Sequence, residues 1–225
     1  MVVLLDESLC FPDPRNGEED GLLAMGGDLS PERLLLAYSK GIFPWYSHEV
    51  GAMPEWYCPM KRFVLFPSEI HISHSMKQLM NQQRYYVTYN EDFSGVIHGC
   101  ATAQQRDKQD GAWLGPDMIK AYEELFRIGY AMSVEVWHEE RLVGGLYGVR
   151  LGYALFGESM FSLEPNASKL ALINLALTFG EVGGRLIDCQ IETPHLRSMG
   201  ARFISYDEYM SIITMKNDNH SPKTT

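Results

Sequence analysis

Three polar side chains interrupt apolar, strand-like segments and are the first candidates for chemistry. Asp188 and Gln190 alternate with apolar residues in 186–190, and because successive strand side chains point to opposite faces, the two share one face. Glu158 lies near the end of another expected strand, 153–162. A carboxylate in such a setting must be paired, hydrogen-bonded or used in a reaction. Asp188 is thus either a structural group that forms hydrogen bonds with nearby backbone or a reactive group. Glu158 either faces water or takes part in the reaction with Asp188.

Aromatic residues crowd a proline-containing stretch that has neither helical nor strand period. They are Phe43, Trp45, Tyr46, Trp56 and Tyr57. Packing in the core accounts for most of them. Trp45, between Pro44 and a polar stretch, is instead suited to stack on a nucleobase, and Trp113 lies in a similar loop setting.

Familiar catalytic signatures are missing from the sequence. It has no P-loop, no G-x-G-x-x-G after a strand, no G-x-S-x-G elbow and no H-E-x-x-H motif. The seven histidines form no ligand cluster, and the four cysteines stand far apart without a C-x-x-C pair. We therefore expect no metal, no cofactor and no covalent nucleophile. The widely spaced cysteines are typical of a reducing cytoplasm, and no apolar run reaches the ~20 residues of a membrane span.

The elements that would position these residues are helices around a small sheet. Ser30 is a good N-cap before Pro31, and Gly41 ends that helix, whereas 41–46 is neither helix nor regular strand. Further helices are expected near 73–82, 91–101, 116–128, 166–181 and 206–215. An antiparallel meander is expected over 133–137, 142–149 and 153–162, with another strand at 185–190. This order predicts an α+β fold with a mixed, largely antiparallel sheet, compatible with an acetyltransferase-like core.

The charge is unevenly spread along the 225 residues. Lys and Arg total 19 against 29 Asp and Glu, a net charge of −10. Residues 1–60 hold ten acidic and three basic residues, whereas 61–130 are balanced. With the prolines that follow, this shift predicts a small N-terminal domain (1–60), a catalytic domain (61–215) and a flexible polar tail (216–225). The charge excludes a protein that coats duplex nucleic acid, but not one that grips only an RNA end.

Six sequence blocks occur in an order that resembles the leucyl/phenylalanyl-tRNA–protein transferase family. They are LAMGGDL (23–29), YSKGIFPWY (38–46), LVGGLYG (142–148), FGESMFS (156–162), NASK (166–169) and LIDCQ (186–190). The resemblance extends over about residues 11–210. It implies a small N-terminal domain joined to an acetyltransferase-like domain. It also implies transfer of Leu or Phe from aminoacyl-tRNA to an N-terminal Lys or Arg of a protein, which marks that protein for N-end-rule degradation.

The resemblance assigns roles to individual residues. Trp45 and Trp113 match tryptophans that contact the terminal adenosine at the tRNA 3′ end. Glu158 matches the family's Gly-Glu-Ser-Met-Phe glutamate, and Asp188 and Gln190 match its Asp-Cys-Gln pair. Because the aminoacyl ester is already activated, catalysis needs mainly positioning. We predict that Asp188 and Gln190 orient the attacking α-amine, with Asp188 either a general base or an electrostatic partner.

An apolar pocket is expected to select the donor side chain. Its candidate residues are Met160 and Phe179, with Leu146, Leu155 and Leu175. Because one methylene in such a pocket is worth only about 1–3 kcal/mol, we expect methionine to be tolerated. The acidic N-terminal surface and Glu158 would favour a cationic acceptor terminus. We expect a monomer without a membrane partner.

One departure from the family pattern concerns tRNA binding. The family's helix after its His-Ile-Ser motif is often strongly basic, but here 73–85 keeps only Lys77 and Arg84. We therefore predict weak or salt-sensitive tRNA binding, unless bases such as Lys61 and Arg62 compensate.

Two other function classes remain open. An acyl-coenzyme A transferase of similar fold needs a pyrophosphate loop of the R/Q-x-x-G-x-G/A type, and the nearest string, RSMGAR (197–202), ends in arginine. A catalytically dead peptide- or tRNA-binding module is the other, and the intact Glu158, Asp188 and Gln190 argue against it.

Overall fold

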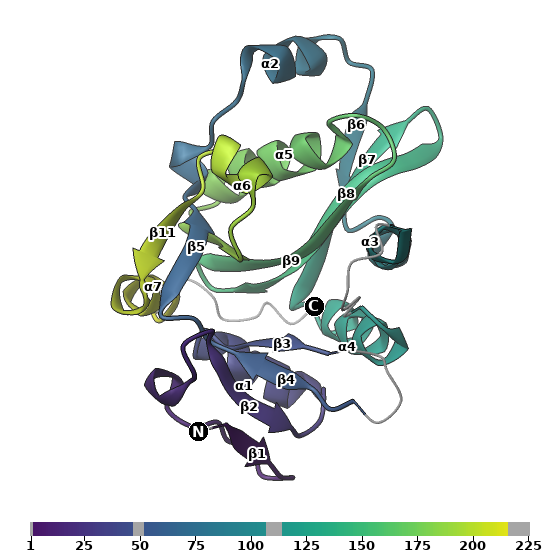
Figure 1. Ribbon diagram of the computed structural model, residues 1–225. Coiled ribbons are helices and arrows are strands. Elements are labelled where there is room, and N and C mark those ends of the chain that lie inside the picture. The colour runs from purple at the N-terminus through teal and green to yellow at the C-terminus, as the bar shows by residue number, and fades with distance from the viewer. Residues whose placement is uncertain (1, 47–51, 107–113, 216–225) are drawn as a thin grey trace.

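The computed structural model describes residues 2–46, 52–106 and 114–215, with side chains except at 104–106, and its strands form two sheets (Figure 1). The smaller sheet has the order β1-β2-β4-β3 and the larger one β11-β5-β10-β9-β8-β7-β6. The strands are β1 (Val3–Leu5), β2 (Leu22–Gly26), β3 (Phe43–Trp45), β4 (Glu55–Tyr57), β5 (Lys61–Leu65), β6 (Tyr86–Tyr89), β7 (Ala131–His138), β8 (Arg141–Leu151), β9 (Ala154–Ser162), β10 (Leu186–Gln190) and β11 (Arg202–Ser205). The α-helices are α1 (Pro31–Ser39), α2 (His74–Asn81), α3 (Phe93–Arg106), α4 (Pro116–Arg127), α5 (Ala167–Glu181), α6 (Pro194–Ser198) and α7 (Tyr206–Ile213).

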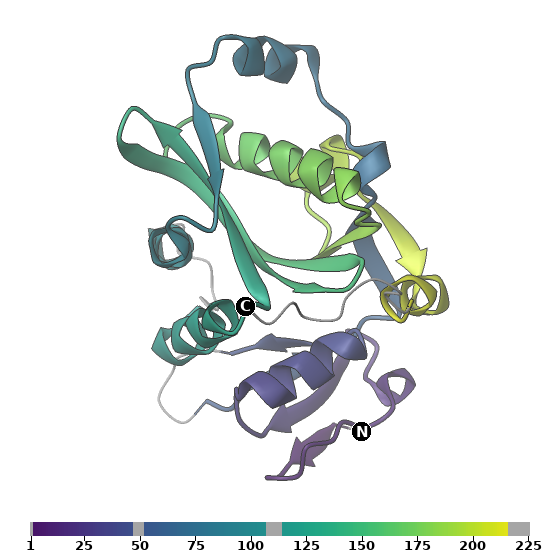
Figure 2. The ribbon, with the colours of Figure 1, turned by 180° about the vertical axis from the view of Figure 1, so that it is seen from behind.

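The larger sheet is mixed but mostly antiparallel. Strands β7, β8 and β9 form the predicted antiparallel meander. Helix α5 then crosses over so that β10 runs parallel to β9, while β5 pairs antiparallel with the other side of β10. Helix α5 covers one face of this sheet, and α3 and α4 lie on the other, as Figures 1 and 2 show. The predicted α+β class and its largely antiparallel sheet are confirmed.

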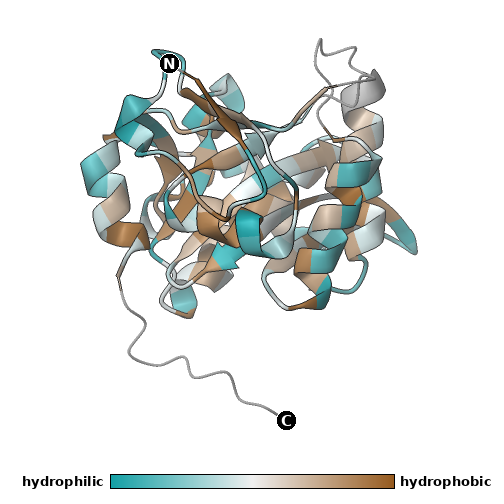
Figure 3. Cartoon of the chain, turned by 90° about the horizontal axis from the view of Figure 1, so that it is seen from below, coloured by the Kyte–Doolittle hydropathy of each residue, from teal (hydrophilic) through white to brown (hydrophobic). Residues whose placement is uncertain are grey.

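The helix boundaries follow local sequence signals. The Ser30 hydroxyl accepts a hydrogen bond from the Arg33 N–H, and Gly41 adopts a φ of +74° just after α1 ends. Surface helices carry hydrophilic and hydrophobic residues side by side (Figure 3). In α4 the buried side chains recur every three or four residues, which is the pattern of a helix with one face on the core. No helix in the described part of the chain combines the length and apolar character of a membrane span.

The strands of the smaller sheet are the main difference from the predicted elements. The segment 41–46, expected to be irregular, contributes β3, which pairs with β4 so that Phe43 lies opposite Tyr57 and Trp45 opposite Glu55. Proline lacks an N–H donor and is therefore poorly tolerated in a central strand. Pro44 is tolerated because β3 is an edge strand, whose outer side has no neighbouring strand to accept a hydrogen bond. Strands of three residues show no period that a sequence pattern can reveal.

The two sheets share a hydrophobic core. Leu34 and Tyr38 of α1 and Trp56 of β4 belong to the same buried cluster as Tyr122 of α4 and Phe156 of β9. All strands of the smaller sheet precede residue 58, and all strands of the larger sheet follow residue 60. The change of sheet thus falls between residues 57 and 61, and packing is continuous across it.

Candidate active site

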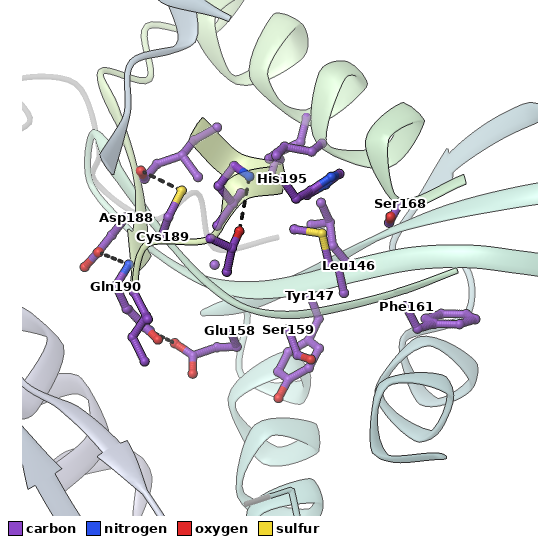
Figure 4. Close-up of a pocket in the computed structure, with 18 of the residues that line it drawn as sticks. Leu146, Tyr147, Glu158, Ser159, Phe161, Ser168, Asp188, Cys189, Gln190 and His195 are labelled. Carbon is purple, nitrogen blue, oxygen red and sulfur yellow. Dashed lines mark hydrogen bonds between the residues drawn. The ribbon is translucent and has the colours of Figure 1, made fainter. Parts of the chain in front are cut away.

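A cavity of about 660 Å³ opens where β9, β10 and α5 meet the end of β3 (Figure 4). Strands β9 and β10 pair only from Leu186 opposite Ala154 to Asp188 opposite Phe156. Beyond these residues both strands are irregular. The register of β9 against β8 shifts at Glu158, and that of β10 against β5 shifts at Cys189. Because bulges re-aim side chains and end pairing, these two shifts create the cavity and direct polar groups toward it.

One part of the cavity is apolar. Leu146, Met160, Leu172, Leu175 and Ile187 are among its lining residues. The structure therefore brings three predicted pocket residues, Met160, Leu146 and Leu175, to the cavity wall. Phe179 and Leu155 do not line it. Phe179 lies farther along α5, buried, with the Arg150 guanidinium 5.4 Å from its ring centre, because the helix has by then passed the opening.

Glu158 occupies the polar part of the cavity, and three donors hold its carboxylate. Tyr38 donates to Oε1 at 2.8 Å, Tyr122 donates to Oε2 at 2.7 Å, and the Gln190 side-chain amide donates to Oε1 at 3.0 Å. Figure 4 shows the Glu158 and Gln190 side chains pointing toward one another. Burial raises the pKa of Glu158 to about 7, against the lowering effect of these hydrogen bonds. The carboxyl is therefore poised to gain or lose a proton near neutral pH.

The two tyrosines are fixed as donors. Their hydroxyl oxygens lie 2.8 Å apart, and burial raises the pKa of both Tyr38 and Tyr122 well above the ordinary value. Both hydroxyls therefore keep their protons at any physiological pH. They reach Glu158 from α1 and α4, so two neighbouring helices determine the position of one carboxylate.

Asp188 is fully buried and its carboxylate is saturated with donors. Arg62 Nε lies 3.0 Å from both oxygens, and Arg62 Nη2 lies 2.7 Å from Oδ2. The Tyr209 hydroxyl donates to Oδ2 at 2.7 Å, and the Gln190 backbone N–H donates to Oδ1 at 2.9 Å. These donors occupy both carboxylate oxygens, so Asp188 has little room to bind a substrate group directly.

Gln190 breaks the strand alternation that the sequence predicts for 186–190. Its φ is +59°, in the left-handed region, and it follows directly on the bulge at Cys189. Asp188 and Gln190 are thus brought together by the bulge rather than by regular alternation on one face. The Asp188 carboxylate is bound by Arg62, while the Gln190 amide reaches Glu158.

Of the two tryptophans, the structure places Trp45 at the cavity. It lies half-buried at the end of β3, edge-on to Tyr57 with ring centres 6.5 Å apart. Trp113 lies outside the described residues. The described part of the chain contains no group of three His, Cys, Asp or Glu side chains arranged to hold a metal ion.

Several site residues carried no sequence signal of their role. Tyr38 and Tyr122 had the helical spacing of core residues, and Tyr209 lies in α7, far along the chain. Arg62 was expected among bases available to tRNA, and this is wrong, because it is fully buried and ion-paired. The apolar run Phe63–Leu65 beside it is the one signal of a buried strand.

His195 is another lining residue that sequence reasoning missed. Its Nε2 is buried with no hydrogen-bond partner among the described residues. Burial, with a contribution from Lys169, lowers the pKa of His195, so its ring is neutral at pH 7. Figure 4 places it on the side of the cavity toward α5, away from Glu158.

Two family models and several known proteins match this chain. The family model described as leucyl/phenylalanyl-tRNA protein transferase matches residues 64–214, and that of the family's N-terminal domain matches 27–60. The chain is 49% identical to the leucyl/phenylalanyl-tRNA–protein transferase of Syntrophobacter fumaroxidans over 94% of this chain and 89% of that one. It is 51% identical to the protein of the same name from Syntrophus aciditrophicus, over 93% and 86% of the two chains.

More distant likenesses were also found. The transferase of the same name from Shigella sonnei is 46% identical over 95% of this chain and 89% of its own. Among solved structures, a GCN5-related N-acetyltransferase from Kribbella flavida aligns with a TM-score of 0.39 and 12% identity, over 76% of this chain and 60% of that one. On the family models and the sequence identities, this chain belongs to the leucyl/phenylalanyl-tRNA–protein transferase family.

Proposed function

We propose that this enzyme transfers leucine or phenylalanine from aminoacyl-tRNA to the N-terminal Lys or Arg of acceptor proteins, with methionine tolerated, and so marks them for N-end-rule degradation. The observation that carries the proposal is a single cavity that joins an apolar wall to the Glu158–Gln190 pair beside Trp45. The names of the relatives support the same reaction. The enzyme acts in the cytoplasm as a monomer, with residues 1–60 and 61–215 as its two domains.

The donor binds by stacking and apolar contact. Trp45 stacks on the terminal adenine of the tRNA, with Trp113 as the second stacking residue. The leucine or phenylalanine side chain enters the apolar part of the cavity and contacts Leu146, Met160 and Ile187. The ester carbonyl then lies toward Glu158 and Gln190.

In the reaction, the acceptor's α-amine attacks the ester carbonyl, an amide bond forms, and the tRNA ribose hydroxyl leaves. A protonated α-amine loses one proton before it attacks, and a second proton passes from the nitrogen to the ribose oxygen as that oxygen leaves. A free α-amine has a pKa of about 7.7–8.0, close to that of Glu158, so proton transfer between them is nearly balanced. Gln190 orients the amine through its side-chain amide. Of the two roles predicted for Asp188, the saturated carboxylate supports that of an electrostatic partner.

Transfer assays test this proposal directly. Labelled leucine on Leu-tRNA is offered to one peptide that begins with Arg and to a matched peptide that begins with Asp. We expect the Arg peptide to be labelled preferentially. Labelling of neither peptide contradicts the proposed reaction, and preference for the Asp peptide indicates a different acceptor class. Leucyl-coenzyme A serves as the control donor, and its use in place of Leu-tRNA would favour an acyl-coenzyme A transferase.

A further inference from the structure

Arg62 and Tyr209 lie outside the cavity lining, yet both bind the carboxylate that holds Gln190. We propose that Arg62 and Tyr209 are positioning residues, which fix Asp188 so that its bond to the Gln190 backbone sets the Gln190 side chain against Glu158. The inference deepens the proposed function and rests on it, because positioning is measured through the rate of aminoacyl transfer.

The contacts form one buried cluster. Arg62 and Asp188 are each 0% exposed, and Tyr209 is equally buried. Asp188 Oδ1 accepts from Arg62 Nε and from the Gln190 N–H, and Oδ2 accepts from Arg62 and the Tyr209 hydroxyl. Burial strengthens each of these bonds and also makes each costly to leave unmade. The carboxylate therefore has one defined orientation.

That orientation matters because Gln190 is in a conformation that it would not adopt by itself. A φ of +59° is sparsely populated for residues other than glycine. The Asp188 side chain accepts from the N–H two residues on, which is the hydrogen bond of an Asx turn and stabilises such a bend. If the carboxylate moved, the bend would relax, and the Gln190 amide would leave Glu158.

Arg62 also contacts the strand that presents Trp45. Its guanidinium carbon lies 4.8 Å from the ring centre of Phe43 and 4.9 Å from that of Tyr209, so it is placed between two aromatic rings. Phe43 begins β3 and Trp45 ends it. One buried cation thus links the strand of the proposed adenine-stacking residue to the bulge of the proposed amine-orienting residue.

Two substitutions that neutralise the Arg62–Asp188 pair separate positioning from stability. Asp188→Asn keeps an oxygen for the Gln190 N–H but leaves Arg62 as an unpaired buried cation, so we expect transfer to fall at least about 100-fold and the melting temperature to drop by about 10 °C. Arg62→Met combined with Asp188→Asn removes both charges. We expect this double variant to recover most of the melting temperature but little of the lost transfer rate, because nothing then fixes the side chain at position 188. Recovery of transfer together with melting would overturn the inference, because it would show that Arg62 is not needed for positioning.

A second experiment covers the case in which the double variant does not fold. Tyr209→Phe removes only one hydroxyl, and we expect it to lower kcat about fivefold with KM for the acceptor unchanged. In a Gln190→Ala background the same substitution should lower kcat less than about twofold, since Tyr209 acts through Gln190. Equal losses in both backgrounds would contradict positioning and indicate a general structural effect.

The control is Tyr206→Phe, on the same helix, whose hydroxyl donates to the Lys40 carbonyl rather than to Asp188. It should leave kcat unchanged. An assay of the unaltered chain tests the proposed function separately from the positioning roles of Arg62 and Tyr209. Absence of transfer by the unaltered chain contradicts the proposed function, and the inference falls with it. An active chain with equal Tyr209→Phe losses in both backgrounds contradicts the inference alone.

Discussion

At the scale of single residues, Glu158 shows how surroundings determine chemistry. Burial raises its pKa from the ordinary 4.5 to about 7, while Tyr122, Tyr38 and Gln190 donate hydrogen bonds that favour the charged form. The result is a carboxyl that is half-ionised at the pH where an α-amine begins to lose its proton. In the proposed reaction, this balance would let a proton pass between Glu158 and the acceptor amine.

We expect the transfer rate to rise with pH through about 7 as Glu158 ionises. Glu158→Gln should abolish that step and lower the rate about 100-fold.

Because the folded-state pKa of Glu158 is raised, its carboxyl favours folding below pH 4.5, and this contribution to stability is lost as pH rises through about 7. Glu158→Gln should therefore melt higher than the unaltered chain above neutral pH. Single-turnover rates and melting curves across the pH range check both, and an unchanged pH step would contradict the role of Glu158.

The tyrosines should control the position of that step. Tyr122→Phe removes a donor to the charged carboxylate, which is worth roughly one pKa unit, so the rate step should move upward by about that amount. Tyr147→Phe is the matched control, because the buried Tyr147 hydroxyl has no hydrogen-bond partner among the described residues. The pH–rate profiles of the two variants measure the pH at which the transfer rate rises. Equal shifts in both variants would contradict a specific effect of the hydrogen bond from Tyr122.

At the scale of elements, the site depends on irregularities in strands that are otherwise regular. Glu158 is the extra residue of β9 where Gly148 of β8 pairs with Gly157, and Cys189 is the extra residue of β10 against β5. A regular β9 would carry Glu158 to a different face. The short edge strand β3 then brings Trp45 to the same opening.

Gly148 is the residue that permits the bulge in β9. A Cβ at this position would lie 2.3 Å from the Phe156 carbonyl oxygen, so Gly148→Ala must displace backbone. We expect a loss of about 2 kcal/mol in the free energy of unfolding and at least about tenfold in transfer rate, as Glu158 moves. Urea unfolding and transfer assays measure these effects. Gly17→Ala, where the nearest atom lies 3.4 Å away, is the control, and similar losses there would contradict a local cause.

At the scale of the whole molecule, several basic side chains of the described residues are buried or paired with acids. Arg62 and Arg33 are fully buried, and Arg84, exposed beside α2, pairs with Glu164 at 2.9 Å. Arg15 and Arg202 likewise pair with acids. Of the two bases expected to compensate for the weakly basic 73–85 segment, only Lys61 is exposed. In the proposed binding mode, stacking and apolar contact would supply much of the affinity.

Of the two outcomes predicted from the sequence, weak or salt-sensitive tRNA binding, the proposed binding mode favours weak binding with a shallow salt dependence. We expect log Kd for aminoacyl-tRNA to change with log salt concentration with a slope of about 2–3, as for a few phosphate contacts. Proteins that grip six to ten phosphates lose about 10³–10⁵ in affinity over a modest rise in salt. Filter binding over a salt series measures the slope, and a value in that steeper range would contradict binding by the RNA end.

The sequence by itself determined the features that depend on neighbouring residues. Caps and apolar periods predicted α1, α2, α4, α5 and α7, and alternation predicted the meander and β10. Polar residues in apolar strands made Glu158, Asp188 and Gln190 candidates, and the proline-containing aromatic stretch made Trp45 one before the family resemblance supported it.

Only the tertiary structure decided which distant groups meet these residues. Tyr38 is 120 residues from Glu158, and Arg62 is 126 residues from Asp188. Hydrogen bonds across such separations form because packing brings strands and helices together, and no local propensity encodes them. The bulges at Glu158 and Cys189 arise from pairing between strands, so they too appear only in the folded chain. Residue types indicated the candidates for chemistry, whereas burial and long-range contacts decided that Arg62 and Tyr209 bind Asp188 and that two tyrosines and Gln190 bind Glu158.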